Sequence, residues 1–148
     1  IYSGTMAAAL EGAIAGVPSI GFSLLDYSLD ADFSQSEDHV LRIARHTLES
    51  HLKSGICLNV NIPKLSRKQI KGVKVCRQSD GYWEEHYDER TNPMGKKYYW
   101  LTGKFYNHDD GKDTDIWALE NGYISIVPVK FDVTAHEHIQ QLNFLNHE

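Results

Sequence analysis

Two hydroxyl side chains flank a glycine near the start of the sequence, at Ser3, Gly4 and Thr5. Residues 5–15 follow as an alanine-rich stretch, and Ala is the strongest helix former. The first backbone N–H groups of a helix lack partners and lie at the positive end of its dipole, so hydroxyl groups beside them suit a bound phosphate. Ser and Thr are also ordinary N-cap residues. The pattern is therefore compatible with a phosphate site or with a plain helix cap.

Other clusters of polar residues do not match known metal motifs. The acidic run 109–115 resembles a calcium-binding loop, but Tyr106 and Trp117 occupy positions where an EF-hand requires acidic ligands. Residues 136–138 read His-Glu-His, but Gln140 stands where a zinc-protease helix has its second histidine. Solvated loops explain both segments, and neither a Gly-x-Ser-x-Gly elbow nor a P-loop occurs in the sequence.

The first part of the chain predicts alternating helices and strands. Residues 18–24 and 57–62 are short apolar runs typical of strands in a parallel sheet. Between them, apolar residues from Val40 to Leu52 recur at helical spacing, after a predicted N-cap at Ser36. A helix followed by a buried strand is the second half of a β–α–β unit. We expect this α/β part to finish at residue 63.

The second part of the chain is marked by a dense group of aromatic residues. Residues 82–106 include eight of them, divided by the turn sequence Asn92-Pro93-Met94-Gly95. This pattern predicts a long hairpin. Because an isolated two-stranded hairpin is not stable in water, we expect it to pack on a neighbouring subunit or on its own core.

Four further elements are predicted around the hairpin. They are a strand at 73–78, a short helix at 114–121, a strand at 123–129 and a last helix from Asp132 onward with Thr134 as its cap. Asp132 and His136 are spaced to pair across one helical turn, either as a structural contact or as an acid–base couple.

Composition excludes several classes of protein. The 148 residues are 41% hydrophobic and carry a net charge of -5, which does not suit a protein that coats a nucleic-acid polymer. The basic stretch 64–74 is interpreted as a solvated linker and strand face. No apolar run is long enough for a membrane span, and Cys57 and Cys76 are too few for a disulfide scaffold. Since the sequence begins at Ile1 without an initiator Met, we expect a fragment.

A series of colinear motifs closely resembles the SurE (stationary-phase survival) family of metal-dependent nucleoside 5'/3'-monophosphate phosphatases. The matching segments are residues 2–12, 16–20, 59–63, 93–103, 114–119, 122–128 and 132–134. Departures are Asn92 and Met94 around the Pro-x-Gly turn, and Val127 at a position where the family commonly has Thr.

The resemblance implies a site of which only one part is in this sequence. Ser3, Gly4 and Thr5 would contact phosphate. The family's divalent metal, Mg²⁺ or Mn²⁺, is held by an Asn-Asp-Asp-Gly motif, a Ser and an Asn that precede these residues and are absent from the sequence. We therefore assign no metal ligand or catalytic residue to this chain, and expect residues 1–148 to be inactive alone.

The resemblance also implies a fold, partners and a location. The fold expected is the C-terminal part of a Rossmann-like three-layer α/β SurE fold, with an extended β-hairpin arm and a C-terminal helix. Residues 1–63 would complete the α/β core, and residues 64–148 would mediate oligomerisation. The expected partners are a nucleoside monophosphate and further copies of the chain, as a cytoplasmic dimer or tetramer joined through the 82–106 arm. The alternative function is a non-catalytic assembly domain.

Overall fold

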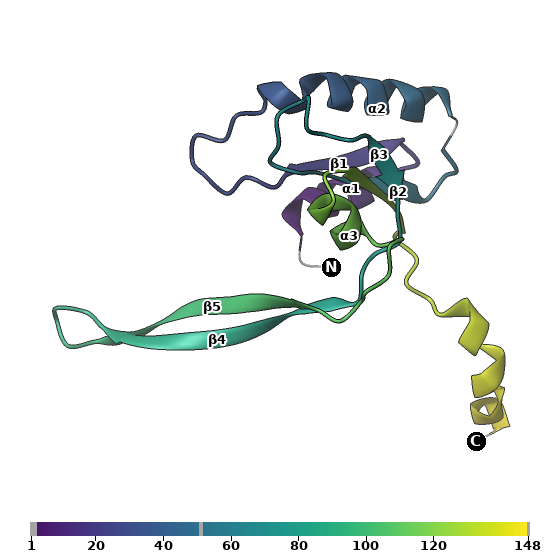
Figure 1. Cartoon of the computed structure of the whole chain (residues 1–148). Coiled ribbons are helices and arrows are strands. Elements are labelled where there is room, and N and C mark those ends of the chain that lie inside the picture. The colour runs from purple at the N-terminus through teal and green to yellow at the C-terminus, as the bar shows by residue number, and fades with distance from the viewer. Residues whose placement is uncertain (1–2, 51, 148) are drawn as a thin grey trace.

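The computed structural model describes residues 3–50 and 52–147, which form an α/β body with two extensions (Figure 1). The helices of the body are α1 (Gly4–Ile14), α2 (Glu37–Glu49) and α3 (Asp115–Glu120). The strands are β1 (Ser19–Leu24), β2 (Ile56–Ile62), β3 (Val73–Val75), β4 (Gly81–Thr91), β5 (Lys97–Asn107) and β6 (Ile124–Lys130). Short 3₁₀ helices occur at Ser34–Ser36, His136–His138 and Gln140–His147.

Four strands form one mixed sheet in the order β1-β2-β6-β3. β1 and β2 are parallel, β6 runs antiparallel to β2, and β3 is parallel to β6. The sheet therefore combines strands from both of the expected segments, 1–63 and 64–148. The division of the chain into a core segment and an assembly segment stays a prediction, whereas the expected α/β class is confirmed.

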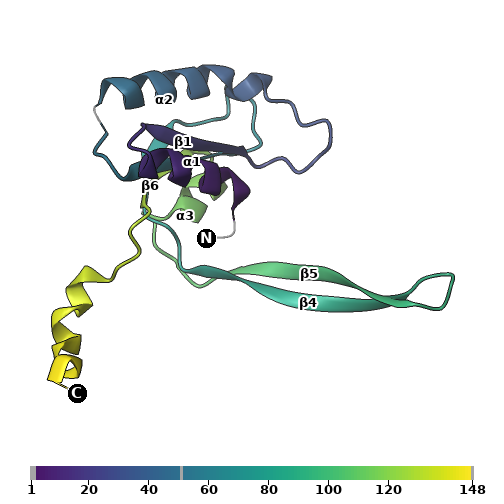
Figure 2. The same cartoon turned by 180° about the vertical axis from the view of Figure 1, so that it is seen from behind.

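Helices cover both faces of this sheet, which gives the expected three layers. α2 lies on one face, while α1 and α3 lie on the other (Figures 1 and 2). On the α2 side, Ile43 packs against buried Val60 and Ile124. On the α1 side, the small residues Ala9 and Ala13 pack against Cys57. Burial of these apolar side chains is the main force that holds the body together.

The hairpin predicted for residues 82–106 is present as a long arm. β4 and β5 pair along their whole lengths, and the arm points away from the body (Figure 1). At its tip, Asn92 Oδ1 accepts hydrogen bonds from the N–H groups of Met94 and Lys96, at 3.0 and 2.9 Å. The arm does not fold back on its own core: Trp83 is 64% exposed and Trp100 is 55% exposed.

One arginine joins the stretch of chain before β4 to the stretch after β5, at the base of the arm. Arg77 Nη2 donates to Asp109 Oδ1 at 2.9 Å, Arg77 Nη1 pairs with Asp109 Oδ2, and Arg77 Nε donates to Asp113 Oδ2 at 2.9 Å. These bonds hold the pKa of both carboxyl groups below its ordinary range. The acidic run that resembles a calcium loop is therefore partly used by an arginine of the same chain.

The C-terminal segment differs from the helix that we predict from Asp132. It forms 3₁₀ helices at His136–His138 and Gln140–His147, and Ile139 and Leu142 are about half exposed. A short helix gains most of its stability from tertiary packing, which this segment lacks within the described residues. The predicted pairing of Asp132 with His136 is present, at 2.7 Å between Oδ2 and Nε2.

Two smaller predictions need correction. Ser36 precedes α2 as predicted, but its hydroxyl donates to the carbonyl of Phe33 at 2.7 Å and does not cap the helix. The strand predicted at 73–78 ends at Val75, and Arg77 makes only an isolated bridge to Thr114. Among the residues described, no helix has the length and apolar character required to cross a membrane.

Candidate functional site

The N-terminus of α1 lies at the carboxyl end of β1. Along α1, Gly12 lies beside Ser19 at the start of β1, and Thr5 lies beside Gly21 further along it. A Cβ atom at Gly21 would be only 2.8 Å from Met6 Sδ and 3.3 Å from Thr5 Cγ2. Glycine at position 21 therefore lets the first turn of α1 lie directly on the strand.

The three predicted phosphate-contacting residues form this helix start. Ser3 is the N-cap, and its Oγ accepts a hydrogen bond from Met6 N–H at 3.2 Å. The N–H groups of Gly4 and Thr5 have no partner within the helix, as at every helix start. A Cβ atom at Gly4 would have no neighbour within 4 Å, so the space beside this residue is open. The helix-cap interpretation is correct for Ser3. Because its Oγ accepts a hydrogen bond in the cap, its hydroxyl proton is still available to donate to a ligand.

Polar side chains of β2 lie next to this helix start. Asn59 pairs in register with Gly21, and Asn61 pairs with Ser23. Alternation along the strand places both asparagines on the same face as Cys57, which α1 covers. Asn61 Nδ2 donates to Asn59 Oδ1 at 3.2 Å. In the sequence, these asparagines stand out only as part of the matching segment 59–63. The pattern that indicates a site there is two polar residues alternating within a buried strand.

The residues described do not fit a metal centre. Over residues 3–50 and 52–147, no three His, Cys, Asp or Glu side chains come together in a group that could hold an ion. The site at the start of α1 contributes hydroxyl, amide and backbone N–H groups, which suit an anion.

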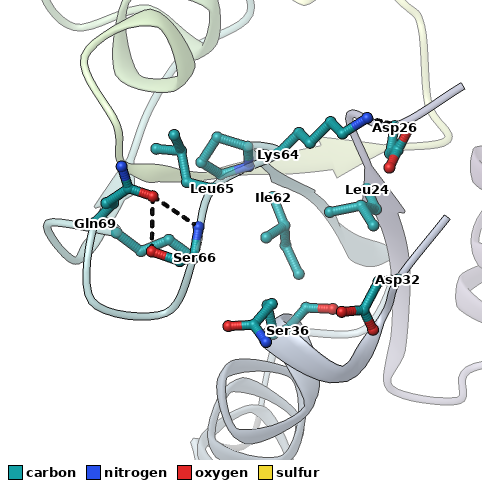
Figure 3. Close-up of a pocket in the computed structure, with 12 residues that line it drawn as sticks. Leu24, Asp26, Asp32, Ser36, Ile62, Lys64, Leu65, Ser66 and Gln69 are labelled. Atoms are coloured by element: carbon teal, nitrogen blue, oxygen red, sulfur yellow. Dashed lines mark hydrogen bonds and ion pairs between the residues drawn. The ribbon is translucent and has the colours of Figure 1, made fainter.

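A hollow lies on the other side of the sheet, between the loops that follow β1 and β2 (Figure 3). Its volume is about 390 Å³, and Leu24 and Ile62 are among the residues that line it. Lys64 Nζ pairs with Asp26 Oδ1 at 3.0 Å. Hydrogen bonds from Ser28, and then this lysine, lower the pKa of Asp26 to about 2. Asp26 and Asp32 bring two carboxylates to the hollow, which therefore suits a phosphate less well than the α1 site.

The fold is of the α/β class, in which a helix start at the carboxyl edge of parallel strands is a common position for a bound anion. The family model described as "Survival protein SurE" matches residues 1–85. The chain belongs to the SurE family, and the resemblance predicted from its motifs is confirmed.

Relatives and a solved structure extend this match over nearly the whole chain. "5'-nucleotidase SurE" of Christiangramia forsetii is 59% identical over 97% of this chain, as is the protein of the same name from Flavobacterium johnsoniae. The crystal structure of the SurE protein from Aquifex aeolicus superimposes with a TM-score of 0.78 at 34% identity, covering 98% of this chain and 58% of that one. The chain spans about 55% of the length of the two relatives.

Proposed function

We propose that this chain is part of a phosphoric monoester hydrolase that releases phosphate from nucleoside 5'/3'-monophosphates, and that Ser3, Gly4 and Thr5 bind the phosphate. The observation that carries the proposal is the start of α1, capped by Ser3 and seated at the carboxyl end of β1. The name 5'-nucleotidase, which the two relatives share, supports the same reaction class.

Each group at the start of α1 has a defined task in this proposal. The N–H groups of Gly4 and Thr5 and the hydroxyl groups of Ser3 and Thr5 donate hydrogen bonds to the phosphate oxygens. During hydrolysis negative charge redistributes over these oxygens, and fixed donors stabilise it more than water does, because they do not have to reorient. The positive end of the α1 dipole acts in the same direction.

The proposal includes a divalent cation, Mg²⁺ or Mn²⁺, which supplies Lewis-acid chemistry when bound. Because the described residues do not provide a ligand set, we assign its ligands to the family's Asn-Asp-Asp-Gly motif and the other upstream residues that this sequence does not include. Residues 1–148 are accordingly expected to lack phosphatase activity by themselves.

Replacing Ser3 and Thr5 together with Ala in the full-length protein tests the phosphate site. Losing donors aimed at the reacting phosphate lowers turnover by an amount equivalent to about 2–4 kcal/mol of transition-state stabilisation. Losing the helix cap costs about 1 kcal/mol of folding stability. Turnover of AMP and the melting temperature are measured on the same samples.

Thr114 provides a matched control for this experiment. It caps α3, where its Oγ accepts from Trp117 N–H at 3.2 Å. Thr114→Ala removes a helix cap away from the site, so it lowers the melting temperature and leaves the turnover of the folded enzyme unchanged. If the Ser3/Thr5 double variant behaves like Thr114→Ala, its hydroxyl groups only cap α1 and do not bind phosphate.

The arm supports a second part of the proposal, assembly with further copies of the chain into a dimer or tetramer. Large side chains such as Trp83, Trp100 and Leu101 are more than half exposed on it. Apolar surface of this kind is typical of an interaction site. The alternative function, a non-catalytic assembly domain, rests on the same arm, and measurable phosphatase activity of the full-length protein excludes it.

A cytoplasmic location also belongs to the proposal. Cys57 and Cys76 are both buried free thiols, and burial raises the pKa of each. Reduced, unreactive cysteines of this kind fit a reducing compartment.

A further inference from the structure

The two faces of the central strands differ in polarity. On the α2 side, the side chains of β2 are apolar along the whole strand, with Leu58, Val60 and Ile62 in the core, and those of β6 are apolar from Ile124 through Ile126 to Pro128. On the α1 side, β2 begins with Cys57 and continues with Asn59 and Asn61. Its antiparallel neighbour changes in the same direction, from Val127 opposite Asn59 to Ser125 opposite Asn61. The face that α1 covers thus becomes polar toward the carboxyl end of β2.

Ser125 has unused hydrogen-bonding capacity within this polar area. The residue is 0% exposed, and its Oγ has no hydrogen-bond partner among the residues described. Buried hydroxyl groups almost always have a partner, so an exception needs an explanation. Ser125 is the register partner of Asn61 and therefore points into the same layer. A polar group that binds on this face would provide what Ser125 lacks.

Asn59 is the polar residue of β2 that lies beside the start of α1. Its register partner is Gly21, which has no side chain to separate it from the helix. Thr5 Cγ2 would be 3.3 Å from a Cβ atom at Gly21, so Thr5 occupies the space directly over this glycine. Neighbouring strands of a sheet lie about 4.8 Å apart. Asn59 and Thr5 are therefore neighbours over Gly21.

Asn61 determines which end of the Asn59 amide is available. Its Nδ2 donates to Asn59 Oδ1 at 3.2 Å, which engages the acceptor end of Asn59. The two Nδ2 hydrogens of Asn59 are donors, as are the N–H groups of Gly4 and Thr5. An oxyanion at the start of α1 is the ligand that such a group of donors matches.

We propose that Asn59 contacts the phosphate through its Nδ2 and that Asn61 positions the Asn59 amide by holding its Oδ1. This inference rests on the proposed function, because it adds a third element, β2, to the phosphate site formed by α1. The ligand class is a phosphate monoester or inorganic phosphate.

The test uses the full-length protein and the variant Asn59→Asp, which replaces a donor with a carboxylate of the same shape. We expect KM for AMP and the inhibition constant of inorganic phosphate to rise at least tenfold. Asn143→Asp is the matched control, because it makes the same chemical change at an exposed residue of the C-terminal segment. Both constants stay unchanged in this control.

A double-mutant cycle tests the positioning role of Asn61. Asn61→Ala raises the inhibition constant of phosphate in the wild-type background but has no further effect in an Asn59→Ala background, since it acts through Asn59. Additive effects of the two changes would overturn the positioning role. If Asn59→Asp does not fold, Asn59→Ala removes the donor without adding charge.

The outcomes separate this inference from the proposed function. An active wild type whose folded Asn59 variants keep KM and phosphate inhibition overturns the inference and leaves the proposed function standing. An inactive wild type overturns the proposed function. In that case phosphate binding is measured directly by calorimetry: a loss in Asn59→Asp supports the contact, and equal binding by both proteins refutes it.

Discussion

The central sheet and the arm are both built from paired strands, but their side chains have opposite environments. In the sheet, Val60 and Ile124 are 0% exposed and lie beneath α2. In the arm, Trp83 and Tyr87 are 64% and 63% exposed. Backbone hydrogen bonds between β4 and β5 therefore hold the arm in its extended shape, but they leave its apolar side chains exposed. The difference indicates that the sheet is stabilised by burial within the chain, whereas the arm gains little stability from burial within it.

Contacts within the arm are modest. Tyr82 and Tyr106 stack with their ring centroids 5.9 Å apart, and Lys97 pairs with Glu89 at 2.7 Å. Exposed ion pairs of this kind each contribute about 0–1 kcal/mol. These contacts keep the two strands in register, but they do not replace the burial that the sheet obtains from its helices.

Deleting most of the arm should produce the largest effect, because it removes the proposed assembly surface altogether. Replacing residues 85–102 with a short Gly linker in the full-length protein lowers the oligomer mass measured by light scattering. The unfolding transition of the body stays close to that of the intact protein, since the arm buries little against the sheet. An unchanged oligomer mass would show that the arm is not the assembly element.

Two large-to-small substitutions, one in the sheet and one in the arm, compare the stability of the two regions directly. Ile124→Ala in the sheet should cost about 2–5 kcal/mol of unfolding free energy, because it leaves a cavity in a closed core. Trp83→Ala in the arm removes a larger side chain, yet it should cost less in a protein held below its association concentration. Urea denaturation at low protein concentration measures both. Equal losses would mean that the arm is buried within the monomer.

The smallest expected effect concerns the ion pair between Lys64 and Asp26 at the rim of the body, which is tested by lowering the pH. The folded structure lowers the pKa of Asp26 to about 2 from an ordinary value of 3.8, so the carboxylate contacts favour folding above about pH 4 and are lost between pH 4 and pH 2. Carboxyl-carbon NMR should show a midpoint near 2. Lys64→Met should raise that midpoint only in part, because Ser28 still donates to Asp26 at 2.6 Å. A midpoint near 3.8 in the wild type would contradict these contacts.

Local signals in the sequence were sufficient for the elements that depend on local chemistry. The cap at Ser3, the cap at Thr114 and the turn at Asn92 are all present where the residue types indicate. Each requires only residues within four positions along the chain, which is why a single sequence is enough to find it.

Features that depend on distant pairing were not predictable in the same way. The central position of β6, antiparallel to β2, joins segments more than sixty residues apart, and the apolar pattern of β6 fits either direction. For the same reason Asn59 could not be placed in the candidate site from its type. Its role depends on Gly21 in the neighbouring strand and on Thr5 above that glycine. The C-terminal helix was over-predicted because periodicity does not reveal whether a packing surface exists.

Arg77 gives the arm a mechanical property. Both strands of the arm leave the body next to this one side chain, which ties Asp109 and Asp113 to the end of the β3 segment. Because the arm is long, a small rotation at its base produces a large displacement at its tip. In the proposed assembly, the angle between two subunits joined through their arms would therefore depend on contacts inside each subunit. Changes at position 77 could alter the symmetry of an assembly without touching the surface where its members meet.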